Sequence, residues 1–243
     1  MLYIVDIDQT IARRNTPVYL ERCNRFLKLG IESSRLKGMT YKDFLRQPEI
    51  DEQRERVSQQ RLDHVFRLIA FDPAHLRAMD QVPGARDCLE TLALIGDVSY
   101  ATCRCFPTQA ELNQKVQGAT FEWLDSNVFP NPEDVLFCDG YADKLTQVAR
   151  LLEREDDDGI LVDDSWRELL EAYDAVDFDV KHILSQRLTL WAFGASEVPQ
   201  YTAIATQPLP TWKPMETYLK FTTTENEKEN EEVNHERTES TTA

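Results

Sequence analysis

Short apolar runs that alternate with helical patterns constrain the fold of this chain more than any other feature. The first run, Leu2–Val5, is apolar throughout and partly β-branched, which is typical of a strand buried on both faces of a sheet. Similar runs predict further strands at residues 98–102, 135–138, 160–162, 188–193 and 202–206. Stretches with helical spacing separate most of these runs, and this alternation indicates an α/β fold with a Rossmann-like, doubly wound parallel sheet.

A long helical stretch interrupts the alternation after the first strand. From Pro17 to Met79 no segment has a good strand pattern, whereas apolar residues recur at helical spacing. Thr16 can cap a helix that begins at Pro17, and a second helix is predicted over about residues 51–71. The expected division of the chain is an α/β core at residues 1–15 and 83–220 and an α-helical insertion at residues 16–82.

The formal net charge of −16 is unevenly distributed along the chain. Residues 17–82 carry twelve basic and ten acidic side chains, so the insertion is the net-positive part. Residues 221–243 carry seven acidic and two basic side chains and almost no apolar ones, which predicts a disordered acidic tail without enough apolar surface to bury. The acidic balance disfavours binding of long nucleic acids, but it does not exclude a small phosphate ester as substrate.

Membrane and secretory proteins are disfavoured by the sequence. The strongest apolar stretch, residues 188–195, is far shorter than the roughly 20 residues that a membrane-spanning helix needs. No signal-peptide pattern precedes the first strand. The five cysteines are scattered and odd in number, which fits a reducing compartment better than a disulfide framework. We therefore expect a cytoplasmic protein, and no feature of the sequence indicates its oligomeric state.

Polar residues follow three of the predicted strands, at the edge where ligands bind in such sheets. Asp6 and Asp8 follow the first strand, Thr102 ends the second, and Asp163 and Asp164 follow the fourth. The carboxylates of Asp6 and Asp163 could share a hard divalent cation such as Mg²⁺. Asp8 could protonate a leaving oxygen and later deprotonate water. These residue types in this arrangement indicate chemistry on a phosphate group.

A cationic side chain is also needed, because negative charge develops on a phosphoryl group as it reacts. Lys144 fits this role, since it lies at the start of the helix that precedes the strand of Asp163. Lys144 could instead be a solvated helix residue, in which case Lys115 is the substitute.

The order of these motifs resembles that of the haloacid dehalogenase (HAD) superfamily, over residues 1–15 and about 83–220. The resemblance implies that Asp6 is a nucleophile that forms an aspartyl-phosphate, and that Asp8 is the general acid/base. It also implies that Thr102 and Lys144 complete the catalytic set by holding the phosphoryl group. The implied Mg²⁺ ligands are Asp6, the backbone carbonyl of Asp8, Asp163 and, directly or through water, Asp164.

Further residues belong to the predicted site. Thr10 of the first motif and Arg104 are the expected substrate contacts, although Arg104 could simply pair with surface acids. Asp164 could be only a neighbour of Ser165, the predicted cap of the next helix. Gln9 stands where many family members have glycine. The helical insertion looks like the mobile cap of the family, which closes on the substrate and excludes water.

The second aspartate of the first motif discriminates between activities within this family. Dehalogenase members are similar but lack it, so Asp8 favours a phosphomonoesterase, and the resemblance predicts a Mg²⁺-dependent phosphatase of a small phosphorylated metabolite. A faint likeness of residues 101–104 and 119–124 to nucleotide and polynucleotide phosphatases makes a 3′-phosphatase the alternative. The second alternative is a non-catalytic HAD-like binding or regulatory module, which would have no need of Asp8 and Lys144 together.

Overall fold

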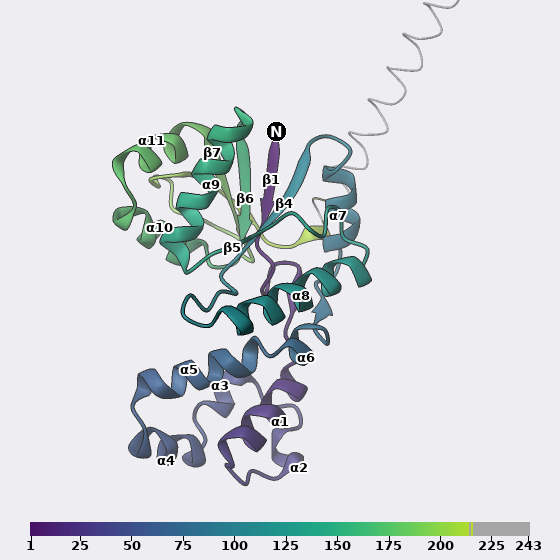
Figure 1. Ribbon diagram of the computed structural model, residues 1–243, viewed down its shortest axis with the longest axis vertical. Coiled ribbons are helices and arrows are strands. Elements are labelled where there is room, and N and C mark those ends of the chain that lie inside the picture. The colour runs from purple at the N-terminus through teal and green to yellow at the C-terminus, as the bar shows by residue number, and fades with distance from the viewer. Residues whose placement is uncertain (214, 216–243) are drawn as a thin grey trace, which may run out of the picture.

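A six-stranded sheet forms the centre of the molecule in a computed structural model that describes residues 1–213 and 215 (Figure 1). All neighbouring strands of this sheet run parallel, so the predicted parallel sheet is confirmed. The strands in their order across the sheet are β5 (Val135–Phe137), β4 (Asp97–Thr102), β1 (Leu2–Val5), β6 (Gly159–Asp163), β7 (Leu188–Phe193) and β8 (Ala205–Leu209). The chain winds from β1 outward in both directions, which makes β1 and its neighbours the switch point of the sheet.

Helices cover both faces of the sheet, as the doubly wound prediction requires (Figure 1). Tyr3 and Val5 of β1 pack with the helices of one face, whereas Leu2 and Ile4 pack with those of the other, because alternate residues of a strand point to opposite sides. The first face carries α7 (Ala85–Leu92) and α8 (Ala110–Ser126), and the second carries α9 (Tyr141–Glu155), α10 (Trp166–Ala172), the short 3₁₀ turn Tyr173–Ala175 and α11 (Phe178–Arg187).

The insertion between β1 and α7 has a hydrophobic core of its own, built from buried residues such as Tyr19, Phe44 and Phe66. Its helices are α1 (Thr16–Leu27), α2 (Ser33–Leu36), α3 (Tyr41–Phe44), α4 (Pro48–Arg56), α5 (Gln59–Ala70) and α6 (Pro73–Leu76). An antiparallel ribbon of β2 (Ala12–Arg13) and β3 (Asp80–Gln81) holds its two ends side by side. Strands of two residues are too short for a period-2 pattern, so the sequence did not reveal them.

The sequence predicted a single helix over about residues 51–71, but the structure has two helices there, α4 and α5. The chain breaks at Val57, whose backbone is extended, and Ser58 caps a new helix by accepting a hydrogen bond from the Arg61 N–H. The apolar stripe continues across the break, so periodicity alone could not detect it. The first helix also begins differently, because Asn15 caps it in place of Thr16.

The last strand of the sheet lies three residues later than predicted, at β8 in place of residues 202–206. Pro208 within it pairs with Ala192, and a proline is tolerated there because β8 is an edge strand. Among residues 1–213 and 215, no helix has the length and apolar character needed to cross a bilayer. The predicted acidic tail, residues 221–243, lies outside the described residues.

Candidate active site

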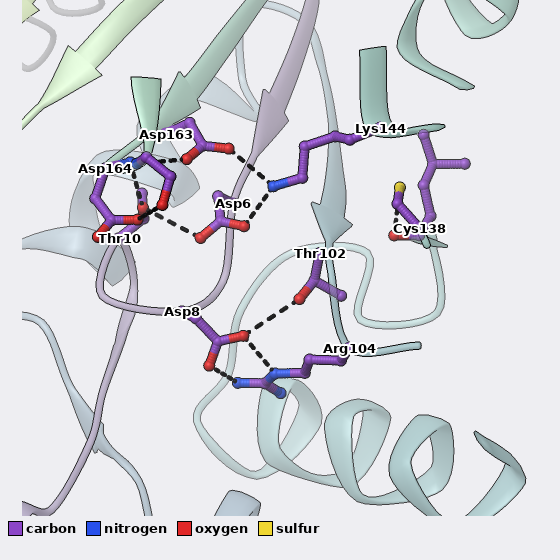
Figure 2. A network of polar contacts seen from close by, with 11 residues as sticks. Asp6, Asp8, Thr10, Thr102, Arg104, Cys138, Lys144, Asp163 and Asp164 are labelled. Carbon is purple, nitrogen blue, oxygen red and sulfur yellow. Dashed lines mark hydrogen bonds and ion pairs between the residues drawn. The ribbon is translucent and has the colours of Figure 1, made fainter. Parts of the chain in front are cut away.

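Three adjacent strands bring the predicted site residues together at one edge of the sheet (Figure 2). Asp6 follows β1, and Thr102 and Asp163 end its two neighbours, β4 and β6. All three strands run parallel, so their carboxyl ends meet at the same edge. The Asp6 N–H continues the sheet pattern by donating to the Val162 carbonyl at 2.8 Å, which fixes the first residue after β1 against β6.

Lys144 reaches this edge from α9 and links two of the carboxylates (Figure 2). Its ammonium donates to Asp6 Oδ1 at 2.6 Å and to Asp163 Oδ2 at 2.8 Å, and the side chain is only 1% exposed. Burial alone would lower the pKa of Lys144, but the charges of Asp163 and Asp6 raise it well above its ordinary value. Lys115, the alternative, lies exposed on α8 and pairs with Glu111.

A group of three carboxylates surrounds the end of β1. Oxygens of Asp6, Asp163 and Asp164 lie within 4.8 Å of one another. Burial raises the pKa of Asp6 well above its ordinary value; Lys144 opposes this, and the neighbouring aspartates add to it. Burial, and then the charge of Asp163, raise the pKa of Asp164 to about 7. An all-oxygen donor set suits a hard divalent cation, so these three residues could hold an ion such as Mg²⁺.

A tight turn after β1 sets the positions of Asp8 and Thr10. The Ala12 N–H donates to the Ile7 carbonyl, and the Gln9 N–H donates to the Ala12 carbonyl, both at 2.8 Å. Gln9 has a φ of +64°, the left-handed region in which a residue with a side chain costs roughly 1–2 kcal/mol more than glycine. The surrounding hydrogen bonds therefore compensate for the absence of glycine in the first motif.

Thr10 faces the carboxylate group from this turn and is fully buried. Its hydroxyl donates to Asp6 Oδ2 at 3.4 Å and accepts from the Asp164 N–H at 3.2 Å. The Trp212 indole N–H stabilises the turn by donating to the Thr10 carbonyl at 2.8 Å. In this structure Thr10 connects the β1 loop to the β6 loop, and its contact with substrate stays a prediction.

Asp8 points away from the carboxylate group and meets Arg104 (Figure 2). Arg104 Nε donates to Asp8 Oδ2 at 2.8 Å and Nη2 donates to Oδ1 at 3.0 Å, in a two-point contact. Thr102 adds a third donor at 3.3 Å. Burial raises the pKa of Asp8, but the charge and hydrogen bonds of Arg104 outweigh it, so the pKa lies below its ordinary value. Metal binding through the Asp8 carbonyl stays a prediction.

The environment of Arg104 was not foreseen from the sequence. Its side chain has no exposed surface, and its remaining donors contact the Thr120 hydroxyl at 3.0 Å and the Met79 sulfur at 3.3 Å. The structure therefore places Arg104 against the side chain of Asp8, and a contact with substrate stays a prediction. Trp123 is buried in the core, and its indole N–H donates to the Met79 carbonyl.

The helical insertion contacts the Arg104 loop from two sides. Met79, near the end of the insertion, touches the guanidinium, and Arg67 of α5 donates to the backbone carbonyls of Cys105 at 2.7 Å and Cys103 at 3.3 Å. Residues of the insertion thus support the loop that carries the partner of Asp8. No sequence pattern indicated these long-range contacts.

Replacing Arg104 with methionine is expected to impair Asp8 without dismantling the carboxylate group. Loss of the hydrogen bonds to a charged partner should cost about 2 kcal/mol of unfolding free energy. The pKa of Asp8 should rise, so whichever limb of a pH–rate profile Asp8 controls should move to higher pH. Urea denaturation and pH–rate profiles measure both effects. Arg86→Met, which removes an exposed arginine with two surface partners, is the control; equal behaviour of the two variants would contradict this role of Arg104.

Comparisons with known proteins find similarity only among solved structures. No protein-family model matches the chain, and no curated protein matches it. A haloacid dehalogenase-like family hydrolase from Xanthomonas campestris has a TM-score of 0.45 and 14% identity, over 90% of this chain and 94% of that chain. A haloacid dehalogenase-like hydrolase from Burkholderia xenovorans has a TM-score of 0.47 and 16% identity, over 88% and 96%.

A third similar structure is a HAD family hydrolase from Deinococcus radiodurans, solved with bound phosphate and sodium. Its TM-score is 0.41 at 14% identity, over 90% of this chain and 87% of that chain. The descriptions of all three name the superfamily that the sequence motifs resemble. Because these TM-scores are below 0.5, function has to be argued from the residues of the site.

Proposed function

We propose that this protein is a Mg²⁺-dependent phosphomonoester hydrolase of the HAD type. The observation that carries the proposal is the buried contact of Lys144 with Asp6 and Asp163, beside the separately held carboxylate of Asp8. A phosphatase of this kind needs a nucleophilic carboxylate, a cation at the phosphoryl group and a second carboxylate for proton transfer. These three groups gather at one edge of the sheet in this chain.

The proposed reaction has two steps at the side chain of Asp6. In the first, an Asp6 carboxylate oxygen forms a bond to phosphorus, the bond from phosphorus to the leaving oxygen breaks, and Asp8 gives that oxygen a proton. In the second, water attacks the phosphorus of the aspartyl-phosphate, the bond to Asp6 breaks, and Asp8 takes a proton from the water. Arg104 favours the ionised form of Asp8. The second step requires that form, whereas the first step requires the protonated form.

In this proposal, Lys144 and Thr102 hold the phosphoryl oxygens during both steps. Lys144 is held by two carboxylates and needs little reorganisation to meet developing negative charge. The residues that would hold Mg²⁺ are Asp6, Asp163, Asp164 and the backbone carbonyl of Asp8. When bound, the cation would neutralise phosphate charge that otherwise repels the Asp6 carboxylate.

A small phosphorylated metabolite is the proposed substrate class. The net charge of −16 works against a long nucleic acid, whose binding usually depends on a basic surface. The 3′-phosphatase alternative would gain support if phosphate were released from 3′-phosphorylated oligonucleotides in preference to metabolites. The assembled Asp6, Asp8 and Lys144 argue against a non-catalytic module.

Addition of Mg²⁺ is expected to stabilise the protein and to start hydrolysis of an aryl phosphate. A ligand that binds only the folded state at about 100 times its Kd adds roughly 2.7 kcal/mol of stability. A thermal-unfolding series with Mg²⁺ and with EDTA measures binding, and phosphate release measures activity. Asp163→Asn should lose both responses, whereas Asp125→Asn, an exposed aspartate of α8, should keep both. Mg²⁺ binding without hydrolysis across a broad phosphate panel would refute the phosphatase proposal.

A further inference from the structure

A second polar cluster lies where the chain enters the insertion, next to the turn that carries Asp8. Its centre is Arg14, a half-buried residue two positions before α1. The Arg14 guanidinium lies 4.2 Å from the ring centroid of Tyr19 and 5.4 Å from that of Tyr41. Within residues 1–213 and 215, no ion pair joins Arg14 to a carboxylate, whereas the buried Arg104 pairs with Asp8 and Arg22 pairs with Asp72. Arg14 is therefore a cation without a carboxylate partner.

The backbone brings Arg14 close to the active site. Asp8 forms a β-bridge with Ala12, and Arg14 follows two residues later, where the chain enters the insertion. The charge of Arg14 is near enough to lower the pKa of Asp8, after burial and the larger effect of Arg104. Arg14 thus lies between the acid/base carboxylate and the aromatic residues of the insertion.

His75 brings unsatisfied hydrogen-bonding atoms to the same cluster. Its ring centroid lies 5.4 Å from that of Tyr19, and the residue is only 1% exposed. Neither ring nitrogen has a hydrogen-bond partner among the described residues. Burial, and then the charges of Arg14 and Arg22, lower the pKa of His75 to about 4, so the ring is neutral at pH 7 with one N–H donor. Leaving such a group unpaired in a protein interior is costly, and a bound ligand would supply the missing partner.

A purely structural role explains this cluster less well. Stacking on two tyrosine rings satisfies only part of the hydrogen-bonding capacity of a guanidinium, which has five N–H donors. A packing role alone also leaves both ring nitrogens of His75 without a hydrogen-bond partner among the described residues. Arg14 and His75 both contact the Tyr19 ring, and a cation and a neutral imidazole donor that share a neighbour are together suited to an anion.

We infer that Arg14 and His75 bind a second anionic group of the substrate, either a carboxylate or a second phosphate, while Lys144 and Thr102 hold the reacting phosphoryl group. This inference rests on the proposed function, because it assigns the two ends of one substrate. It narrows the substrate class to small phosphomonoesters with a second negative group. The Arg14 cluster would then determine specificity, and the carboxylate group would carry the chemistry.

Binding of matched ligands tests the inference independently of turnover. The Asp6→Asn variant serves as the parent, and calorimetry gives its affinity for phenyl phosphate, para-carboxyphenyl phosphate and para-phenylene bisphosphate. We expect one of the two doubly anionic ligands to bind more tightly than phenyl phosphate, and the preferred one identifies the second anion. Adding Arg14→Gln should reduce this preference about tenfold, as expected for loss of a charged hydrogen-bonding partner. Adding His75→Phe should reduce it about threefold without lowering the unfolding temperature.

Arg13→Gln is the matched control, because Arg13 is the exposed neighbour of Arg14 and makes no ion pair among the described residues. It should leave the preference unchanged. Equal affinity for all three ligands, or a preference that survives Arg14→Gln, would overturn the inference while leaving the phosphatase proposal intact. Conversely, an Arg14-dependent preference in a protein that hydrolyses no phosphomonoester would retain the anion site and reject the phosphatase proposal.

Discussion

Asp6→Asn is expected to abolish phosphate release while leaving the protein at least as stable as the wild type. The amide cannot act as the nucleophile, and removal of a nucleophile from a concerted catalytic set costs roughly 10⁴-fold or more in kcat. The expected stability has a separate cause. Burial raises the pKa of Asp6 well above its ordinary value, so the folded state disfavours its ionised form.

The raised pKa of Asp6 also predicts how the unfolding free energy depends on pH, which allows a second measurement on the same variant. A carboxyl with a raised pKa binds its proton more tightly in the folded state than in the unfolded one. Its stabilising contribution is present below the ordinary pKa of an aspartate and is lost as the pH rises through the folded-state pKa. The unfolding free energy of the wild type, measured in EDTA, should therefore fall more steeply than that of Asp6→Asn as the pH rises from the ordinary pKa of an aspartate to the folded-state pKa of Asp6.

The control for Asp6→Asn is Asp97→Asn, at the exposed start of β4. It should retain full activity and show the pH dependence of the wild type. Substantial phosphate release by a well-folded Asp6→Asn would remove Asp6 from the role of nucleophile. Loss of its secondary structure, seen by circular dichroism, would contradict the expected stability.

Lys144→Met is expected to have the second-largest effect, and it should act on both folding and catalysis. Lys144 is the buried cation between Asp6 and Asp163, so methionine would leave two buried carboxylates without it. Removing one partner of a buried ion pair typically costs 3–5 kcal/mol. Loss of the cation at the phosphoryl group should lower kcat by a further factor of about 10² to 10³. Urea denaturation in EDTA and phosphate release measure the two losses.

Lys115→Met is the matched control and also decides between the two candidate lysines. Lys115 forms an exposed pair with Glu111, four residues earlier on α8, and water and salt screen such pairs so that they contribute little to stability. The control should therefore be nearly as stable and as active as the wild type. If Lys115→Met lost activity and Lys144→Met retained it, the assignment of the phosphoryl cation would have to be reversed.

Much of the sheet and of the carboxylate group could be predicted from local patterns. The runs around residues 2–5, 98–102 and 160–162 gave strands because consecutive apolar residues bury both faces of a parallel sheet. Parallel strands share one carboxyl edge, so Asp6, Thr102 and Asp163 could be expected to meet there. The break at Val57 and the ribbon of β2 and β3 could not be predicted, because neither changes the apolar period.

The sequence by itself determined the doubly wound sheet and the residue types at its carboxyl edge, since both follow from periodicity over a few residues. Only the tertiary structure decided which partner each charged side chain takes. Lys144 meets Asp6 across 138 residues of sequence, and Arg104 meets Asp8 across 96. The packing of whole helices and strands determines these ion pairs, because a buried charge is costly unless the fold places an opposite charge next to it. For the same reason only the folded chain revealed that, among the described residues, Arg14 has no carboxylate partner and His75 has no hydrogen-bond partner.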